Sequence, residues 1–150
     1  MRKLPVEETL APLRAALRDG NRAVLVAPPG AGKTTRVPLA LLDEPWLGSG
    51  RIVLLEPRRL AARAAASRMS ETLGQRLGET VGLRARMMTA VSPATRVEVV
   101  TEGVFTRMIV DDPELAGVGA VIFDEFHERS LDADFGLALA LDAQDGLRPD

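Results

Sequence analysis

The sequence predicts an α/β fold in which a parallel sheet is flanked by helices. Short apolar segments of the kind that form buried strands recur along the chain, and segments with helical spacing separate them. Strands that alternate with helices favour parallel pairing through right-handed crossovers. A chain of 150 residues suits one domain with a core of its own.

The start of the chain is predicted to contain a helix followed by a strand. Leucines recur at helical spacing over residues 10–17, and Asp19-Gly20-Asn21 ends this helix as a turn. Pro12 is expected in the first turn of the helix, where its missing N–H costs little. The segment 23–27 is short, fully apolar and rich in valine, which is typical of a buried strand.

The middle of the chain is predicted to form a helix, a strand and a second helix. Residues 33–42 are the expected helix, and Pro38 within it should bend or loosen it. Residues 51–56 read as another buried strand. Residues 58–74 are rich in alanine, a strong helix former, and Gly74 is expected to stop this helix.

The rest of the chain continues the alternation. Residues 80–87 and 95–101 are predicted strands, the second because its valines alternate. Residues 102–112 are predicted to form a short helix, and 119–125 form an apolar strand with two carboxylates at its end. Residues 132–144 are the expected closing helix.

The bulk composition describes an ordinary globular protein and excludes several classes. Hydrophobic residues make up 46% and the net charge is -2, so the surface is not broadly basic and any nucleic-acid contact must be local. The absence of cysteine excludes a disulfide framework, a thiolate metal site and a cysteine nucleophile. The amino terminus lacks a signal-peptide core and the apolar runs are too short to cross a bilayer, so we expect a cytoplasmic protein with no membrane partner.

The turn between the strand at 23–27 and the next helix has the composition of a phosphate-binding loop. Its glycines allow backbone angles that other residues resist, so that successive N–H groups can point at phosphate oxygens. The amino terminus of the helix adds positive partial charge, and a lysine supplies a mobile cation. The residues predicted to hold a nucleotide here are Gly30, Ala31, Gly32, Lys33, Thr34 and Thr35.

Thr34 carries the hydroxyl that such loops use as a ligand of Mg²⁺. The pattern departs from the strict motif because Ala27 stands where glycine is usual. The plainer alternative is a Gly-Pro turn before an unrelated helix with a solvated lysine. The strand, the turn, the Lys33-Thr34 pair and the helix together favour the phosphate loop.

The strand at 119–125 ends in two adjacent carboxylates, Asp124 and Glu125. Nucleotide sites of α/β proteins lie at the carboxyl ends of parallel strands. Asp124 is therefore predicted to hold Mg²⁺ through its water shell, and Glu125 to orient and polarise the attacking water. The alternative is an acidic cap at the start of the next helix. A phosphate loop in the same chain makes that cap the weaker interpretation.

The segment DEFHERS (124–130), which contains the only histidine, resembles motif II of the DEAH/DExH-box helicases. Three upstream segments resemble other motifs of that family in the same order. They are PRRLAA (57–62, motif Ia), VGLRAR (81–86, the VGYxxR strand with Leu83 in place of tyrosine) and TEG (101–103, motif Ib). The longer matching segments cover almost the whole chain and look closest to the bacterial HrpB-type ATP-dependent helicases.

This resemblance implies a P-loop NTPase fold with a RecA-like parallel sheet. It also implies an ATP-dependent nucleic-acid helicase, with RNA favoured over DNA. Lys33, Thr34, Asp124 and Glu125 would bind and hydrolyse the nucleoside triphosphate with Mg²⁺. His127 would couple the nucleotide state to strand separation, and Arg68 matches the position at which the family stacks an arginine on the base.

The resemblance further implies contacts to the nucleic-acid backbone. The residues that match such contacts are Arg58, Arg59, Thr101 and Gly103. The composition alone favours a solvated helix face for the two arginines, whereas a threonine hydroxyl and free N–H groups at a helix start suit a phosphate. Arg63 stays undecided, and Arg84 with Arg86 could form a basic patch or salt bridges.

The family's unit has two RecA-like lobes that clamp the nucleotide, and the second supplies arginine fingers. Residues 1–150 contain no SAT motif III and nothing that resembles the second lobe, so we expect a partial first lobe without its partner. In such lobes the strand leading to SAT lies between those at 23–27 and 119–124. Its absence predicts a gap in the middle of the sheet.

Two other functions remain open. One is a different phosphate-loop enzyme, such as a kinase or a transport ATPase, although neither accounts for the DEFH, PRRLAA and TEG segments. The other is an inactive fragment that binds nucleotide or nucleic acid and turns over nothing. Hydrolysis by these residues alone is therefore left undecided.

Overall fold

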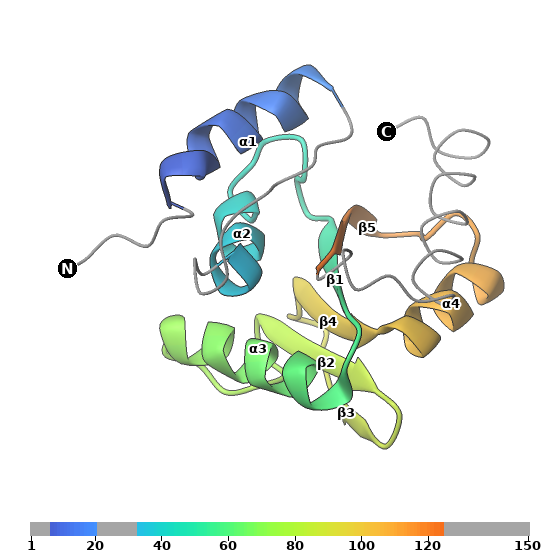
Figure 1. Cartoon of the computed structure of the whole chain (residues 1–150). Helices are drawn as coiled ribbons and strands as arrows, with labels where there is room; N and C mark the ends of the chain where they lie inside the picture. The colour runs from blue at the N-terminus through green and yellow to red at the C-terminus, as the bar shows by residue number, and fades with distance from the viewer. Residues whose placement is uncertain (1–6, 21–32, 125–150) are drawn as a thin grey trace.

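The computed structural model describes residues 7–20 and 33–124 of the chain. Within them lies a sheet of five strands in the order β3-β2-β4-β1-β5 (Figure 1). The strands are β1 (Arg51–Glu56), β2 (Val81–Ala85), β3 (Met88–Ala90), β4 (Val97–Thr101) and β5 (Val118–Phe123). β1 is parallel to β4 and to β5, β2 is parallel to β4, and the short β3 runs antiparallel to β2. The predicted α/β sheet with mostly parallel strands is thus confirmed.

The helices of the described residues cover both faces of this sheet (Figure 1). They are α1 (Glu7–Asp19), α2 (Lys33–Leu41), α3 (Arg59–Thr72) and α4 (Glu102–Asp111). Side chains along β1 alternate between two buried clusters, because Ile52 and Leu54 pack with α2 and α3 whereas Val53 and Leu55 pack with α4. Burial on both faces is typical of parallel sheets and explains the uninterrupted apolar run of this strand.

Three of the strand predictions are confirmed in the described residues. The segments 51–56, 95–101 and 119–125 correspond to β1, β4 and β5. The strand predicted at 23–27 and the helix predicted at 132–144 lie outside the described residues. The gap expected in the middle of the sheet depends on 23–27, so it also stays a prediction.

The segment 80–87, predicted as one strand, contains β2 and then turns back into β3. Arg86 and Met87 form the turn, and Met87 has a left-handed backbone with φ of 62°. Bulky residues rarely adopt this conformation. Because neither turn residue is a glycine or an asparagine, the sequence gives no sign of the hairpin. Gly82 in β2 faces the returning chain, and a Cβ there would lie 2.8 Å from the Ala90 carbonyl oxygen. The glycine of the VGL segment is therefore required by a close approach of backbone.

The helices also lie where the sequence predicts them, with one correction. α1 begins at Glu7, so Pro12 lies inside the helix and not in its first turn as expected. Pro12 is exposed, and water can therefore satisfy the carbonyl that its missing N–H leaves unpaired. Pro38 lies inside α2 as predicted. No helix of the described residues is long and apolar enough to cross a membrane.

Gly74 ends the helix α3 as predicted. It adopts φ of 66°, and its N–H donates to the Glu71 carbonyl at 3.0 Å. The next N–H, of Gln75, donates to the Ser70 carbonyl at 2.9 Å. This pair of bonds is a Schellman motif, in which a left-handed residue satisfies the last carbonyls of a helix.

The helix α1 holds α2 in place from outside. Leucines of α1 pack against the core cluster that includes α2. Arg14 Nη2 donates to the Ala40 carbonyl at 3.0 Å, and Arg18 Nε donates to Glu44 Oε2 at 2.9 Å. The Glu44 side chain is only 2% exposed, so this ion pair is largely shielded on the carboxylate side. These contacts fix the carboxyl end of α2, the helix whose amino end carries Thr34.

Candidate nucleotide and nucleic-acid site

Two residues predicted as metal ligands meet at the carboxyl edge of the sheet. Thr34 lies in the first turn of α2, and Asp124 directly follows β5. The Thr34 hydroxyl donates a hydrogen bond to Asp124 Oδ2, with 2.7 Å between the oxygens. The backbone N–H of Asp124 donates to the Leu55 carbonyl at 3.1 Å, which continues the ladder between β1 and β5 past the last strand residue. The sheet therefore holds Asp124 against the start of α2.

Three polar residues follow one another along this edge. Glu56 ends β1 and is paired in register with Thr101, which ends β4. On the other side of β1, Leu55 is paired with Phe123, so the next residues, Glu56 and Asp124, are neighbours. The carboxyl edges of parallel strands are where ligands bind in open α/β sheets.

The amino end of α4 has the features of an anion site. Thr101 is its N-cap residue, with φ of -84° and ψ of 162°, and its side chain makes no capping hydrogen bond. Gly103 is exposed, and a Cβ at this position would meet no atom within 4 Å. The first N–H groups of a helix have no partner within the helix and attract phosphate oxygens. A phosphate could therefore approach the backbone of this turn closely.

An aromatic contact fixes this helix relative to Asp124. The rings of Phe105 in α4 and Phe123 in β5 have centroids 5.7 Å apart and meet edge to face at 87°. This is a preferred geometry for aromatic pairs. Phe105 is fully buried, so the start of α4 and the end of β5 are joined through the core.

The arginines of the PRRLAA segment lie at the start of α3. Arg58 and Arg59 are exposed, and with Leu60 and Ala61 they line an open hollow of about 510 Å³. Leu60 is an exposed apolar side chain, at 75% of its full surface. Further along the same helix Arg68 is also exposed. These positions leave all three guanidinium groups able to reach a ligand.

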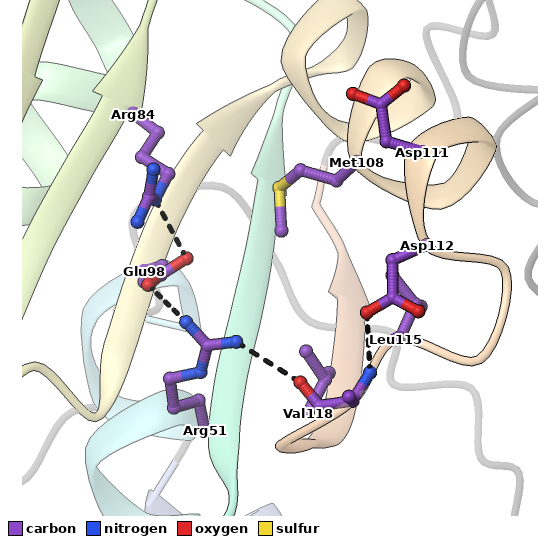
Figure 2. Close-up of a pocket in the computed structure, with 9 residues that line it drawn as sticks. Arg51, Arg84, Glu98, Met108, Asp111, Asp112, Leu115 and Val118 are labelled. Atoms are coloured by element: carbon purple, nitrogen blue, oxygen red, sulfur yellow. Dashed lines mark hydrogen bonds and ion pairs between the residues drawn. The ribbon is translucent and has the colours of Figure 1, made fainter.

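The sequence left open whether Arg84 and Arg86 form a basic patch or salt bridges, and the structure decides this for Arg84. Arg84 Nε lies 3.3 Å from Glu98 Oε2, so this residue belongs to a salt bridge. Arg51 Nη1 donates to the other oxygen of Glu98 at 2.8 Å, and Figure 2 shows the two arginines reaching the carboxylate from either side. They line a pocket of about 280 Å³ on the face that α4 covers. Arg63 and Arg86 are both exposed.

The structure does not test every predicted site residue. Gly30, Ala31, Gly32, Glu125 and His127 lie outside the described residues. Lys33 is the first residue of α2, and Thr35 is half-buried in the same helix. The described part of the site therefore contains Thr34 and Asp124 but neither the predicted phosphate loop nor Glu125, the residue predicted to activate water.

The sequence matches the family model of the DEAD/DEAH box helicases over residues 10–143. The chain is 58% identical to the ATP-dependent RNA helicase HrpB of Escherichia coli over 150 residues, which is 100% of this chain and 18% of that protein. It is 34% identical to the ATP-dependent RNA helicase HrpA of Borreliella burgdorferi over 93% of this chain and 17% of that protein. Human ATP-dependent RNA helicase DHX33 is 36% identical over 93% of this chain and 20% of its own length. The chain thus spans a small share of each of these relatives.

Solved structures give the same result. The crystal structure of the E. coli DExH-box NTPase HrpB superimposes with a TM-score of 0.96 and 58% identity, covering 100% of this chain and 18% of that one. A second crystal structure, of the E. coli DEAH/RHA helicase HrpB, gives a TM-score of 0.93 over 98% of this chain and 19% of that one. These matches confirm the predicted RecA-like fold and the predicted resemblance to HrpB-type proteins. By its sequence and its fold, the chain belongs to the DEAD/DEAH box helicase family.

Proposed function

We propose that this chain is the nucleotide-binding part of the first RecA-like lobe of an ATP-dependent RNA helicase. The hydrogen bond between Thr34 and Asp124 carries this proposal, because it joins the end of the phosphate loop to the first carboxylate of DEFH. Relatives named as ATP-dependent RNA helicases support the choice of ATP and of RNA. The partner of this lobe would be a second RecA-like lobe that closes over the nucleotide.

The described residues fit a magnesium ion. Mg²⁺ prefers oxygen ligands and usually keeps several waters beside one or two protein groups and substrate phosphates. The Thr34 hydroxyl and the Asp124 carboxylate offer such oxygens, and the 2.7 Å between the two atoms supports their assignment to one metal site. When bound, Mg²⁺ would neutralise charge on the β- and γ-phosphates.

The remaining residues of the nucleotide site would hold and activate the reactants. Gly30, Ala31 and Gly32 would present backbone N–H groups to phosphate oxygens, and Lys33 would place its ammonium beside them. Glu125 would orient the attacking water and accept its proton as the water oxygen bonds to the γ-phosphorus and the bond to the β–γ bridging oxygen breaks, which releases the diphosphate.

Three further residues would extend the nucleotide site. Thr35, which follows Thr34 in α2, would complete the phosphate loop. The guanidinium of Arg68 would stack on the base, which any base permits and which therefore gives little selectivity. His127 would transmit the nucleotide state toward the nucleic acid.

The nucleic-acid contacts would be made to the backbone. Arg58 and Arg59 would pair with phosphates beside the hollow at the start of α3, and Thr101 with Gly103 would bind a phosphate at the start of α4. Contacts of this kind carry no sequence information. We therefore propose that the protein binds RNA with little sequence preference.

The proposal is tested by measuring ATP hydrolysis by the whole gene product that contains this chain. Hydrolysis should require Mg²⁺ and should rise when single-stranded RNA of mixed sequence is added. Absence of ATP hydrolysis in a folded protein, with or without RNA, would overturn the proposed function. Hydrolysis that RNA leaves unchanged would overturn the helicase part of it and favour a different phosphate-loop enzyme.

The two arginines at the start of α3 should contribute to RNA binding mainly through charge. Arg58→Ala and Arg59→Ala should each weaken binding equally for unrelated RNA sequences. Each should also lower the slope of log affinity against log salt concentration by about 1, because one phosphate contact is lost. Fluorescence anisotropy with labelled RNA at several salt concentrations measures both effects. Arg76→Ala, at an exposed position beyond the far end of α3, is the matched control and should leave the slope unchanged.

A further inference from the structure

The strand β1, which lies between β4 and β5, ends in a carboxylate that the sequence motifs do not explain. Glu56 is only 4% exposed, and acidic side chains are rarely buried to this extent unless they are paired. It directly precedes the PRRLAA segment and lies in the strand that pairs with both β4 and β5.

The register of the sheet places Glu56 beside Asp124. Leu55 is paired with Phe123, and the Asp124 N–H donates to the Leu55 carbonyl, so the next pair across the two strands is Glu56 and Asp124. Adjacent strands lie about 4.8 Å apart. The two carboxylates are therefore held on neighbouring strand ends.

Both side chains also lie on the same face of the sheet. Ile52 and Leu54 of β1 belong to the cluster that includes α2, and side chains of a strand alternate, so Glu56 points toward that face as well. Asp124 is on this face because it accepts the hydrogen bond from Thr34 of α2. The helix α2 thus packs on the face of the sheet to which both carboxylates belong.

We propose that Glu56 is a positioning residue of the magnesium–nucleotide site, an inference that rests on the proposed function. Like charges on directly adjacent strand positions repel. A divalent cation on the α2 face offsets this repulsion. Mg²⁺ keeps much of its water shell, and Glu56 accepts hydrogen bonds from that shell, so that Asp124 and the waters take one orientation.

The test measures equilibrium binding of a fluorescent, non-hydrolysable ATP analogue to the whole gene product during a Mg²⁺ titration. Glu56→Gln keeps the size of the side chain and removes its charge. The Mg²⁺ concentration for half-maximal binding should rise about tenfold, which is the usual loss when an outer partner of a metal site is removed. Without Mg²⁺, the variant should bind the analogue at least as tightly as the wild type, because one negative charge near the triphosphate has gone.

A purely structural role for Glu56 makes a different prediction. It would lower the melting temperature and would leave the Mg²⁺ dependence of binding as in the wild type, and that outcome would overturn the inference. Glu98→Gln is the matched control, because Glu98 is only 2% exposed and lies on the opposite face of the sheet. It should lower the melting temperature and leave the Mg²⁺ titration unchanged.

Two further variants keep the result interpretable. If Glu56→Gln does not fold, Glu56→Met removes the charge without leaving a buried amide, and the same tenfold shift is expected. Asp124→Asn separates the two proposals. If it shifts the Mg²⁺ titration and neither Glu56 variant does, only the role of Glu56 is wrong. If Asp124→Asn leaves the titration unchanged as well, the proposed metal site itself is wrong.

Discussion

Replacing Asp124 by asparagine should lower RNA-stimulated ATP hydrolysis by about 100- to 1,000-fold, the loss expected when one preorganised group for transition-state charge is removed. The variant has the same shape, and its amide oxygen can still accept the hydrogen bond from Thr34. What it loses is the negative charge that would hold Mg²⁺ and its waters against the phosphates. The rate is measured at saturating ATP and Mg²⁺ by phosphate release.

Two reference variants give the low and the high hydrolysis rates with which Asp124→Asn is compared. Lys33→Ala removes the cation of the phosphate loop and should lower hydrolysis at least as strongly as Asp124→Asn. Asp111→Asn removes an exposed carboxylate at the end of α4, beside the pocket on the other face, and should hydrolyse ATP at the wild-type rate. A rate for Asp124→Asn within a few-fold of the Asp111→Asn rate would contradict the assignment of Asp124 as the metal carboxylate.

Replacing Arg51 by methionine should lower the free energy of unfolding by about 3 kcal/mol, because it leaves the buried carboxylate of Glu98 without its closer cation. Arg51 donates to Glu98 at 2.8 Å, and the Glu98 side chain is 2% exposed. Arg84, the other cation at this carboxylate, is 40% exposed and offers a longer contact of 3.3 Å. A domain is stable by only about 5–15 kcal/mol, so the loss should be plain in urea unfolding.

The double variant distinguishes a charge effect from lost packing. Arg51→Met with Glu98→Leu removes both the close cation and the buried anion, and it should recover most of the lost stability. Arg63→Met, at an exposed position on α3, should change the stability by less than about 0.5 kcal/mol. Equal losses in the single and double variants would show that the ion pair is not the cause.

The parallel strands and the helix α3 could be predicted because their signals are local. The RIVLLE segment is apolar throughout, since both faces of β1 are covered by helices. Gly74 marks the end of α3 because few other residues adopt its left-handed backbone. The meeting of Thr34 with Asp124 also followed from the sequence, because a loop before a helix and the end of a parallel strand share one edge.

Other features depend on pairing between distant segments and could not be predicted. The partner of Arg84 is Glu98, and it is identified only by the register of β2 against β4. The hairpin at Met87 lacks any residue typical of a turn. No sequence motif contains Glu56. That Glu56 lies beside Asp124 is known only from the pairing of β1 with β5.

The order of strand ends along the carboxyl edge sets the distance between the proposed RNA phosphate and the proposed nucleotide. Asp124 follows β5 and Thr101 ends β4, with β1 between them. Two strand spacings amount to about 10 Å, which equals the Debye length at about 0.1 M salt. An RNA phosphate at Thr101 and a metal-bound nucleotide at Asp124 would therefore sense each other's charge through space. Dissolved ions would set how strongly the two sites communicate, even without any movement of the protein.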